Sequence, residues 1–235
     1  MKIAVQIFGH MRTFQKCAPI LKKKILTKYD CDIFIHTWDK PYHNSNDYQD
    51  DFRSEIIKLY NPKKIKIDKQ DFYNVDGQYI VDTNSNFNGY NVPLNGLKYM
   101  NYSMISANLL RCDYQKECGV KYDYILCVRP DIFLNDDFNI YLYENEFKLN
   151  INTLISFANY PILTVASNRL NISFLANDVF LLTTPFAADT LFSSISDFDK
   201  YYIKFPSVFP KNNFHPEFSF SEMIVGKNII HRIYA

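Results

Sequence analysis

Residues 122–131 read Tyr-Asp-Tyr-Ile-Leu-Cys-Val-Arg-Pro-Asp, an apolar run that ends abruptly in an arginine, a proline and a carboxylate. The four apolar residues in succession are typical of a short strand buried on both faces. Pro130 has no backbone N–H and cannot continue a central ladder, so the strand should end there and deliver Asp131 at its carboxyl end. Ligands of open α/β sheets bind outside the carboxyl ends of the strands. The stretch therefore predicts a site for a divalent metal or an anion, and a surface turn with an incidental Arg–Asp pair is the competing interpretation.

The composition indicates a globular protein that does not bind nucleic acid. The 235 residues suffice for one large domain or two small ones, and 47% of them are apolar against 22% charged. The net charge of +1 argues against binding that is driven by phosphate neutralisation.

The five cysteines and the amino terminus predict a protein of the reducing cytoplasm. Their number is odd and no Cys-x-x-Cys occurs, so neither a disulfide framework nor a zinc site is indicated. The first apolar run, Ile3 to Phe8, is too short for a signal peptide, and polar residues lie within it and soon after it. No stretch approaches 18 apolar residues, so we expect no membrane span. Peripheral contact with the inner face of the cell membrane is left open.

Hydrophobic periodicity predicts an α/β fold with a mostly parallel central sheet flanked by helices and a mixed second half. The predicted strands are 3–8, 31–38, 63–69, 125–128, 153–157, 179–183 and 229–234. The predicted helices are one that becomes regular at Pro19, then 52–60, 101–118, 185–195 and 216–225. Residues 70–100, rich in Asn, Asp, Gly and Tyr, are predicted to be a long loop.

Two polar clusters follow the first two predicted strands. After the first, Gly9 permits close approach of a ligand, Arg12 can bind phosphate and Thr13 can cap the next helix, with His10 among them. An ordinary strand–helix turn is the competing interpretation.

After the second strand, Trp38 and Asp39 can stack on and hydrogen-bond a base or a sugar. The alternative is a Trp that covers the edge of the sheet.

Two further carboxylates are candidates for a general base. Asp178 precedes the strand 179–183, and Glu217 opens the last helix. The simpler interpretation of Glu217 is a favourable charge in the first turn of a helix. The five histidines include no pair with metal-ligand spacing on one element, so a zinc site is not indicated.

Taken together, the motifs resemble a group of bacterial glycosyltransferases of the GT-A type that serve capsular and lipopolysaccharide synthesis. The resemblance covers nearly the whole chain in order. The segments that carry it are Gly9–Phe14, Asp32–Trp38, Ser103–Leu110, Tyr122–Asp131, Asn177–Phe180 and Pro216–Glu217.

The resemblance implies a GT-A-like, Rossmann-like fold and transfer of a sugar from a nucleotide-sugar donor to a saccharide or glycolipid acceptor. Enzymes of this type commonly bind Mn2+ or Mg2+ through Asp-x-Asp at the end of a central strand. Asp131 occupies the matching place and becomes the expected metal ligand, although the position two before it is Arg129. Arg129 is then expected to share the charge of the diphosphate, which puts strict metal dependence in doubt.

The remaining residues are assigned by the same resemblance. We expect a single domain of residues 1–235, in which 1–131 bind the nucleotide-sugar and 132–235 bind the acceptor. Asp178, Glu217 and Arg129 are the expected catalytic residues. The expected donor-binding residues are Gly9, His10, Arg12, Thr13, Trp38, Asp39 and Asp131.

Three other functions compete with this one. A nucleotidyltransferase also combines an α/β sheet with acidic metal ligands, but it usually shows a Gly-rich basic phosphate loop. A glycoside hydrolase can use two carboxylates such as Asp131 and Asp178. A non-catalytic nucleotide- or carbohydrate-binding protein would bind nucleotide without turnover.

Overall fold

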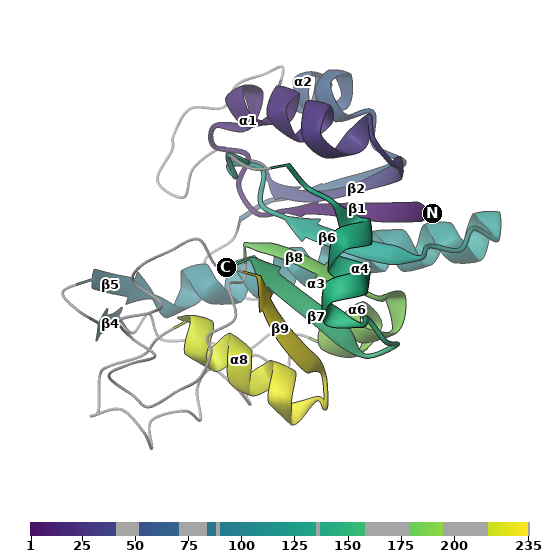
Figure 1. Cartoon of the computed structure of the whole chain (residues 1–235). Coiled ribbons are helices and arrows are strands. Elements are labelled where there is room, and N and C mark those ends of the chain that lie inside the picture. Colours follow the sequence, from purple (N-terminus) through teal and green to yellow (C-terminus); the bar gives the residue numbers. More distant parts are fainter. Residues whose placement is uncertain are drawn as a thin grey trace.

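The computed structural model describes residues 1–40, 52–70, 84–87, 90–134, 137–157, 179–194 and 216–234. They form an open seven-stranded sheet in the order β3-β2-β1-β6-β8-β7-β9 (Figure 1). Its strands are β1 (Lys2–Phe8), β2 (Asp30–Trp38), β3 (Lys64–Asp68), β6 (Tyr124–Val128), β7 (Thr153–Phe157), β8 (Phe180–Thr183) and β9 (Ile230–Tyr234). A separate hairpin pairs β4 (Asn84–Phe87) with β5 (Tyr90–Pro93).

The sheet is mostly parallel, as the sequence predicts. Strands β3, β2, β1 and β6 run parallel to one another, and β9 runs parallel to β7. Only β8 runs against its two neighbours, β6 and β7. The predicted fold class, a mixed α/β fold with a mostly parallel open sheet flanked by helices, is confirmed. The predicted division into a donor half and an acceptor half stays a prediction.

Helices cover both faces of the sheet. They are α1 (Phe14–Leu21), the π-helix η1 (Lys22–Leu26), α2 (Phe52–Tyr60), α3 (Leu94–Cys118), α4 (Ile140–Phe147), α6 (Pro185–Leu191) and α8 (Pro216–Gly226). Residues of α1, α2 and α4 share one hydrophobic cluster, and residues of α3, α6 and α8 share the other. Figure 1 shows α1 and α2 on one side of the sheet and α8 on the other. None of the helices within the described ranges has the length and apolar composition needed to cross a membrane.

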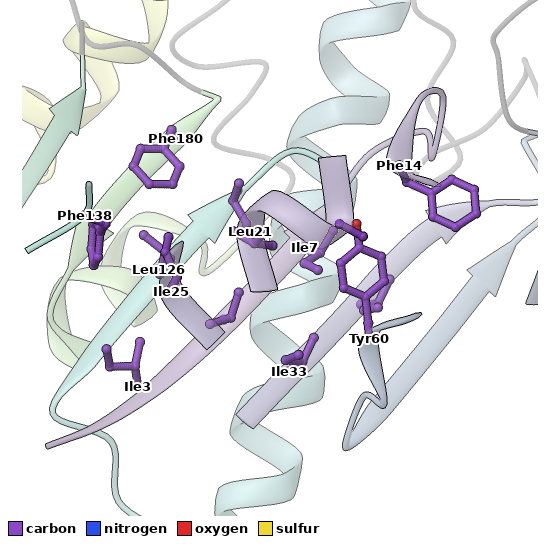
Figure 2. Close-up of a cluster of buried hydrophobic side chains, with 14 of the residues drawn as sticks. Ile3, Ile7, Phe14, Leu21, Ile25, Ile33, Tyr60, Leu126, Phe138 and Phe180 are labelled. Carbon is purple, nitrogen blue, oxygen red and sulfur yellow. The ribbon is translucent and has the colours of Figure 1, made fainter. Parts of the chain in front are cut away.

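Alternation along β1 shows how the two clusters divide the sheet. Ile3, Val5 and Ile7 belong to the cluster with α1 and α2, whereas Ala4 and Phe8 belong to the cluster with α3. Successive side chains of a strand point to opposite faces, so one fully buried strand serves both layers. Figure 2 shows the first cluster, to which helices contribute Phe14, Leu21, Ile25 and Tyr60, and the segment before α4 contributes Phe138.

Two local predictions about the first half are wrong. The first helix begins at Phe14 rather than at Pro19, which lies inside it, and a π-helix follows. Phe14, Ala18 and Leu21 are all buried, and their packing outweighs the hydrogen bond that Pro19 cannot make.

The predicted loop of residues 70–100 is also interrupted. It contains the β4–β5 hairpin and the first turns of α3, which starts at Leu94. Asn95 and Gly96 are poor helix formers, but burial of Tyr99 against the sheet layer overrides their propensity.

The second half follows the sequence more closely. α6 begins with Pro185 at its first turn, and the Thr184 hydroxyl accepts the Ala187 N–H at 3.2 Å, as predicted. α8 and β9 also lie where they were predicted. The sequence gives no clear signal for α4, which Asn139 caps by accepting the Leu142 N–H.

A buried polar network joins α3 to α6 and to β1. Arg111 of α3 is 1% exposed and donates to Asp189 of α6 and to Gln115. It also donates to the side-chain oxygen of Asn108 at 2.8 Å, and the same oxygen accepts from Gln6 at 2.8 Å. A buried guanidinium needs such acceptors because its desolvation is unfavourable without them.

We expect Asp189→Asn to destabilise the protein. Asparagine keeps an oxygen acceptor but removes the charge that offsets buried Arg111, which costs about 1–3 kcal/mol of unfolding free energy. The value is below that for a fully buried pair because the Asp189 side chain is 48% exposed. Urea unfolding monitored by circular dichroism measures it, with Asp113→Asn at an exposed position of α3 as the control. Equal midpoints for the two variants would show that Arg111 does not depend on Asp189.

Candidate ligand site at the ends of β1 and β6

The chain order of the strands reverses at β1. β1 lies between β2 and β6 and is parallel to both, with Ile7 opposite Val128 in register. The carboxyl ends of parallel neighbours meet at one edge, and an open sheet binds ligands at such a reversal. The segments after β1 and β6, which hold Arg12 and Asp131, therefore emerge side by side.

Two arginines hold the carboxylate of Asp131. Arg129 donates from Nε to Oδ1 at 3.0 Å and from Nη2 to Oδ2 at 2.6 Å. Arg12, 119 residues earlier, donates from Nη1 to Oδ2 at 3.0 Å. Asp131 is 14% exposed, whereas Arg12 is 42% exposed and Arg129 25%. The sequence predicted Arg12, Arg129 and Asp131 for one site, and the structure brings these three together.

The electrostatics of this cluster favour an anion. Burial pushes the pKa of Asp131 upward, but the guanidinium groups of Arg129 and Arg12 outweigh burial and hold that pKa below its usual range. The carboxylate is therefore charged at neutral pH. Two guanidinium groups and one carboxylate leave the cluster with a net charge of +1, which attracts phosphate oxygens.

The side chains described at Asp131 do not fit the divalent metal that the resemblance implies. Both carboxylate oxygens already accept hydrogen bonds from guanidinium groups, and a cation there would face two positive charges. Among the described residues, no group of three or more His, Cys, Asp or Glu side chains is placed to hold a metal ion. The metal at Asp131 thus stays a prediction, and the local geometry speaks against it.

A chain of hydrogen bonds fixes the start of the loop after β1. Gly9, at φ +92°, donates its N–H to the Ser103 hydroxyl of α3 at 2.7 Å. Ser103 also contacts Nδ1 of fully buried His36 at 2.7 Å, and Nε2 of His36 lies 3.1 Å from Asp68. An added Cβ at Gly9 would meet no atom within 4 Å, so its positive φ, rather than space, favours glycine there.

The pKa shifts of His36 and Asp68 indicate a neutral imidazole beside a charged carboxylate. Burial lowers the pKa of His36, although Asp68 opposes that shift. The hydrogen bond from His36, with those from Lys66 and Tyr102, lowers the pKa of Asp68 against its burial. We assign Nε2–H of His36 as donor to Asp68, which leaves Nδ1 as an acceptor, and the one hydroxyl proton of Ser103 is shared between Nδ1 and the carbonyl oxygen of His36 at 3.1 Å.

The aromatic side chains of this edge cover Trp38. Its indole is 3% exposed, stacks on Tyr102 at 5.6 Å between centroids, and meets Tyr99 at 5.2 Å. His10 lies 6.4 Å away. This arrangement favours the interpretation that Trp38 covers the edge of the sheet, and its predicted contact with a base stays a prediction.

The other predicted residues are placed as follows. Asp39 accepts the Gln70 N–H at 3.2 Å, and His10 lies within hydrogen-bond distance of the Gln70 side chain. Thr13 occupies the N-cap of α1, but its side chain makes no capping bond, so that expectation was wrong. Asp178 and the side chain of Glu217 lie outside the described residues.

Sequence reasoning missed Ser103 and Asp68. Asp68 ends a parallel strand, and the rule that selected Asp131 also selects it. Ser103 lies within a helix, where no local signal distinguishes it from a solvated serine.

Comparisons with known proteins find similar solved structures but no match by sequence. No protein-family model matches the chain, and no curated protein matches it. Among solved structures, the crystal structure of mouse xyloside xylosyltransferase 1 in its apo form is similar, with a TM-score of 0.43 and 9% sequence identity. The likeness covers 99% of this chain and 84% of that one. At this score and identity it carries no argument about activity.

We expect the ion pairs of Asp131 to make stability depend on pH in the acid range. The pKa of an aspartate in the unfolded chain is about 4, and the pKa of Asp131 in the folded protein is lower. The stabilisation is therefore present above the unfolded pKa and is lost as the pH falls through the folded pKa. The difference in unfolding free energy between wild type and Asp131→Asn should therefore shrink from about pH 6 to about pH 2.5. Denaturant titrations at each pH measure it, and Asp113→Asn controls for the loss of one carboxylate. A difference that stays constant over this range would contradict the pairing.

Proposed function

We propose that this protein is a glycosyltransferase that moves a sugar from a nucleotide-sugar donor to an acceptor hydroxyl. The observation that carries the proposal is the Arg12–Asp131–Arg129 cluster at the edge where β1 and β6 end. It is a positively charged group just beyond two buried strands, at the place where an open α/β sheet binds ligands. The ordered motifs shared with GT-A-type glycosyltransferases support the same function.

The chemistry needs positive charge at this position. The bond from the anomeric carbon to the phosphate oxygen breaks, and that oxygen keeps the electron pair. The acceptor oxygen bonds to the anomeric carbon and gives its proton to a base. Charge grows on the departing nucleoside diphosphate, and preorganised guanidinium groups stabilise it in the transition state. Arg12 and Arg129 have this role in the proposal.

The loop after β1 completes the donor side. The bond from Gly9 to Ser103 fixes its first residue, and Arg12 at φ +37° turns its side chain toward Asp131. His10 and Asp39 lie along the same edge, just after β1 and β2, and in the proposal they contact the nucleoside part of the donor.

The proposal also covers the acceptor and the base that takes its proton. By the resemblance, it is a saccharide or glycolipid in capsule or lipopolysaccharide synthesis. Asp178 is the first candidate for the base that takes the acceptor proton, and Glu217 is the second.

A panel of nucleotide-sugars incubated with the protein tests the proposal. We expect release of a nucleoside diphosphate from one of them, and Arg12→Ala should weaken donor binding at least about tenfold because a charged hydrogen bond is lost. Calorimetry measures the affinity, and the melting temperature should change little since Arg12 is 42% exposed. Arg232→Ala, which removes an exposed arginine on the edge strand β9, is the matched control.

Other results would indicate a different function. Release of pyrophosphate from a nucleoside triphosphate would indicate a nucleotidyltransferase. Nucleotide binding without turnover on any acceptor would indicate a binding protein. Donor affinity that is unchanged in Arg12→Ala would remove Arg12 from the donor site.

The base candidates are ranked by substitution. Asp178→Asn should lose transfer to the acceptor while it still binds donor nucleotide, because a base must lie within hydrogen-bond reach of the attacking hydroxyl. Glu217→Gln should lose less activity and at most about 0.3–1 kcal/mol of stability, since a carboxylate in the first turn of a helix favours the dipole. Transfer rates at saturating donor measure the ranking, and the reverse order would make Glu217 the base.

A further inference from the structure

We propose that the site binds the diphosphate of its donor through Arg12 and Arg129 without a divalent metal, and that Asp131 orients the two arginines. The inference rests on the proposed glycosyltransferase function and concerns how that activity handles charge. It departs from the metal-assisted chemistry that the resemblance implies.

Both oxygens of the Asp131 carboxylate are already occupied by hydrogen bonds. Three hydrogen bonds of 2.6–3.0 Å from two guanidinium groups use both oxygens of Asp131. Mg2+ takes oxygen ligands at about 2.0–2.1 Å, so a metal on either oxygen would displace an arginine or stand beside it. Both alternatives are unfavourable, because the side chains are only partly exposed and like charges repel more strongly away from water.

Arg12 and Arg129 have more N–H donors than Asp131 uses. A guanidinium group carries five N–H donors, of which Arg129 commits two and Arg12 one to Asp131. Both side chains also keep part of their surface in contact with solvent, at 25% and 42% exposure. Within the described ranges no other acceptor is bonded to the remaining donors, so they can bind a ligand that enters from solvent.

Asp131 holds the two arginines in place beside each other. Two guanidinium groups at close range repel each other, and the carboxylate between them offsets that repulsion. Its bidentate contact with Arg129 fixes the plane of that guanidinium, and Oδ2 anchors Arg12 from the other segment. Asp131 thereby acts as a positioning residue for an anion site rather than as a metal ligand.

Binding of inorganic pyrophosphate and of a panel of nucleoside diphosphates, each measured by calorimetry in EDTA and again in Mn2+, tests the inference. We expect pyrophosphate and at least one nucleoside diphosphate to bind in EDTA, with affinities in the two buffers that agree within about threefold. Binding that requires Mn2+ would overturn the inference and leave the glycosyltransferase proposal standing. Binding of pyrophosphate alone in EDTA would support the anion site and contradict the proposed function. Absence of binding in both buffers would overturn both.

Two variants separate the roles of the residues. Asp131→Asn raises the local charge from +1 to +2 but removes the carboxylate that orients the two arginines, so pyrophosphate affinity should fall by about threefold, and by the same factor in EDTA and in Mn2+. A metal site would instead lose at least about tenfold in Mn2+ on removal of its carboxylate, and that result would contradict the inference. Arg12→Ala should lose at least about tenfold in EDTA, and Arg232→Ala should lose nothing. Unchanged affinity in Arg12→Ala would also overturn the inference, whether or not Asp131→Asn folds.

Discussion

The parallel pairing of β1 with β6 is the interaction on which the candidate site depends. Its register places Ile3 opposite Tyr124 and Ile7 opposite Val128, and so fixes where each strand ends. Arg12 and Asp131 are separated by 119 residues, and this pairing brings them within 3.0 Å. Both strands are buried on both faces by the two helical layers, so the register is specified by the core itself. The site is therefore a product of how the sheet packs.

Much of this arrangement could be predicted because short segments of the sequence determine it locally. The apolar run before Arg129 and Pro130 signals a buried strand and its end, and the rule for open sheets then places Asp131 at a ligand-binding edge. Thr184 and Pro185 similarly mark the start of a helix by chemistry that needs no tertiary contact.

What could not be predicted depends on contacts between distant segments. Pro19 argues against a helix in its own neighbourhood, and only the packing of Phe14 against α2 explains why one forms there. Gly96 similarly reads as part of a loop until α3 is seen to begin before it. Ser103 becomes significant only when the helix places it beside Gly9 and His36. Propensity is a weak prior, and tertiary contacts override it at each of these positions.

The anchoring of Gly9 to α3 has a consequence for how strongly ligands are held. A loop that must become ordered on association loses conformational entropy, and that loss reduces affinity. Here the first residue of the loop is already tied to a helix of 25 residues, itself locked at Asn108 and Arg111 into the interior of the protein. Any molecule that reaches this edge thus meets a loop whose first residue, Gly9, is already held in place before Arg12. Association at this edge should therefore cost less conformational entropy than association with a loop that is unattached before binding.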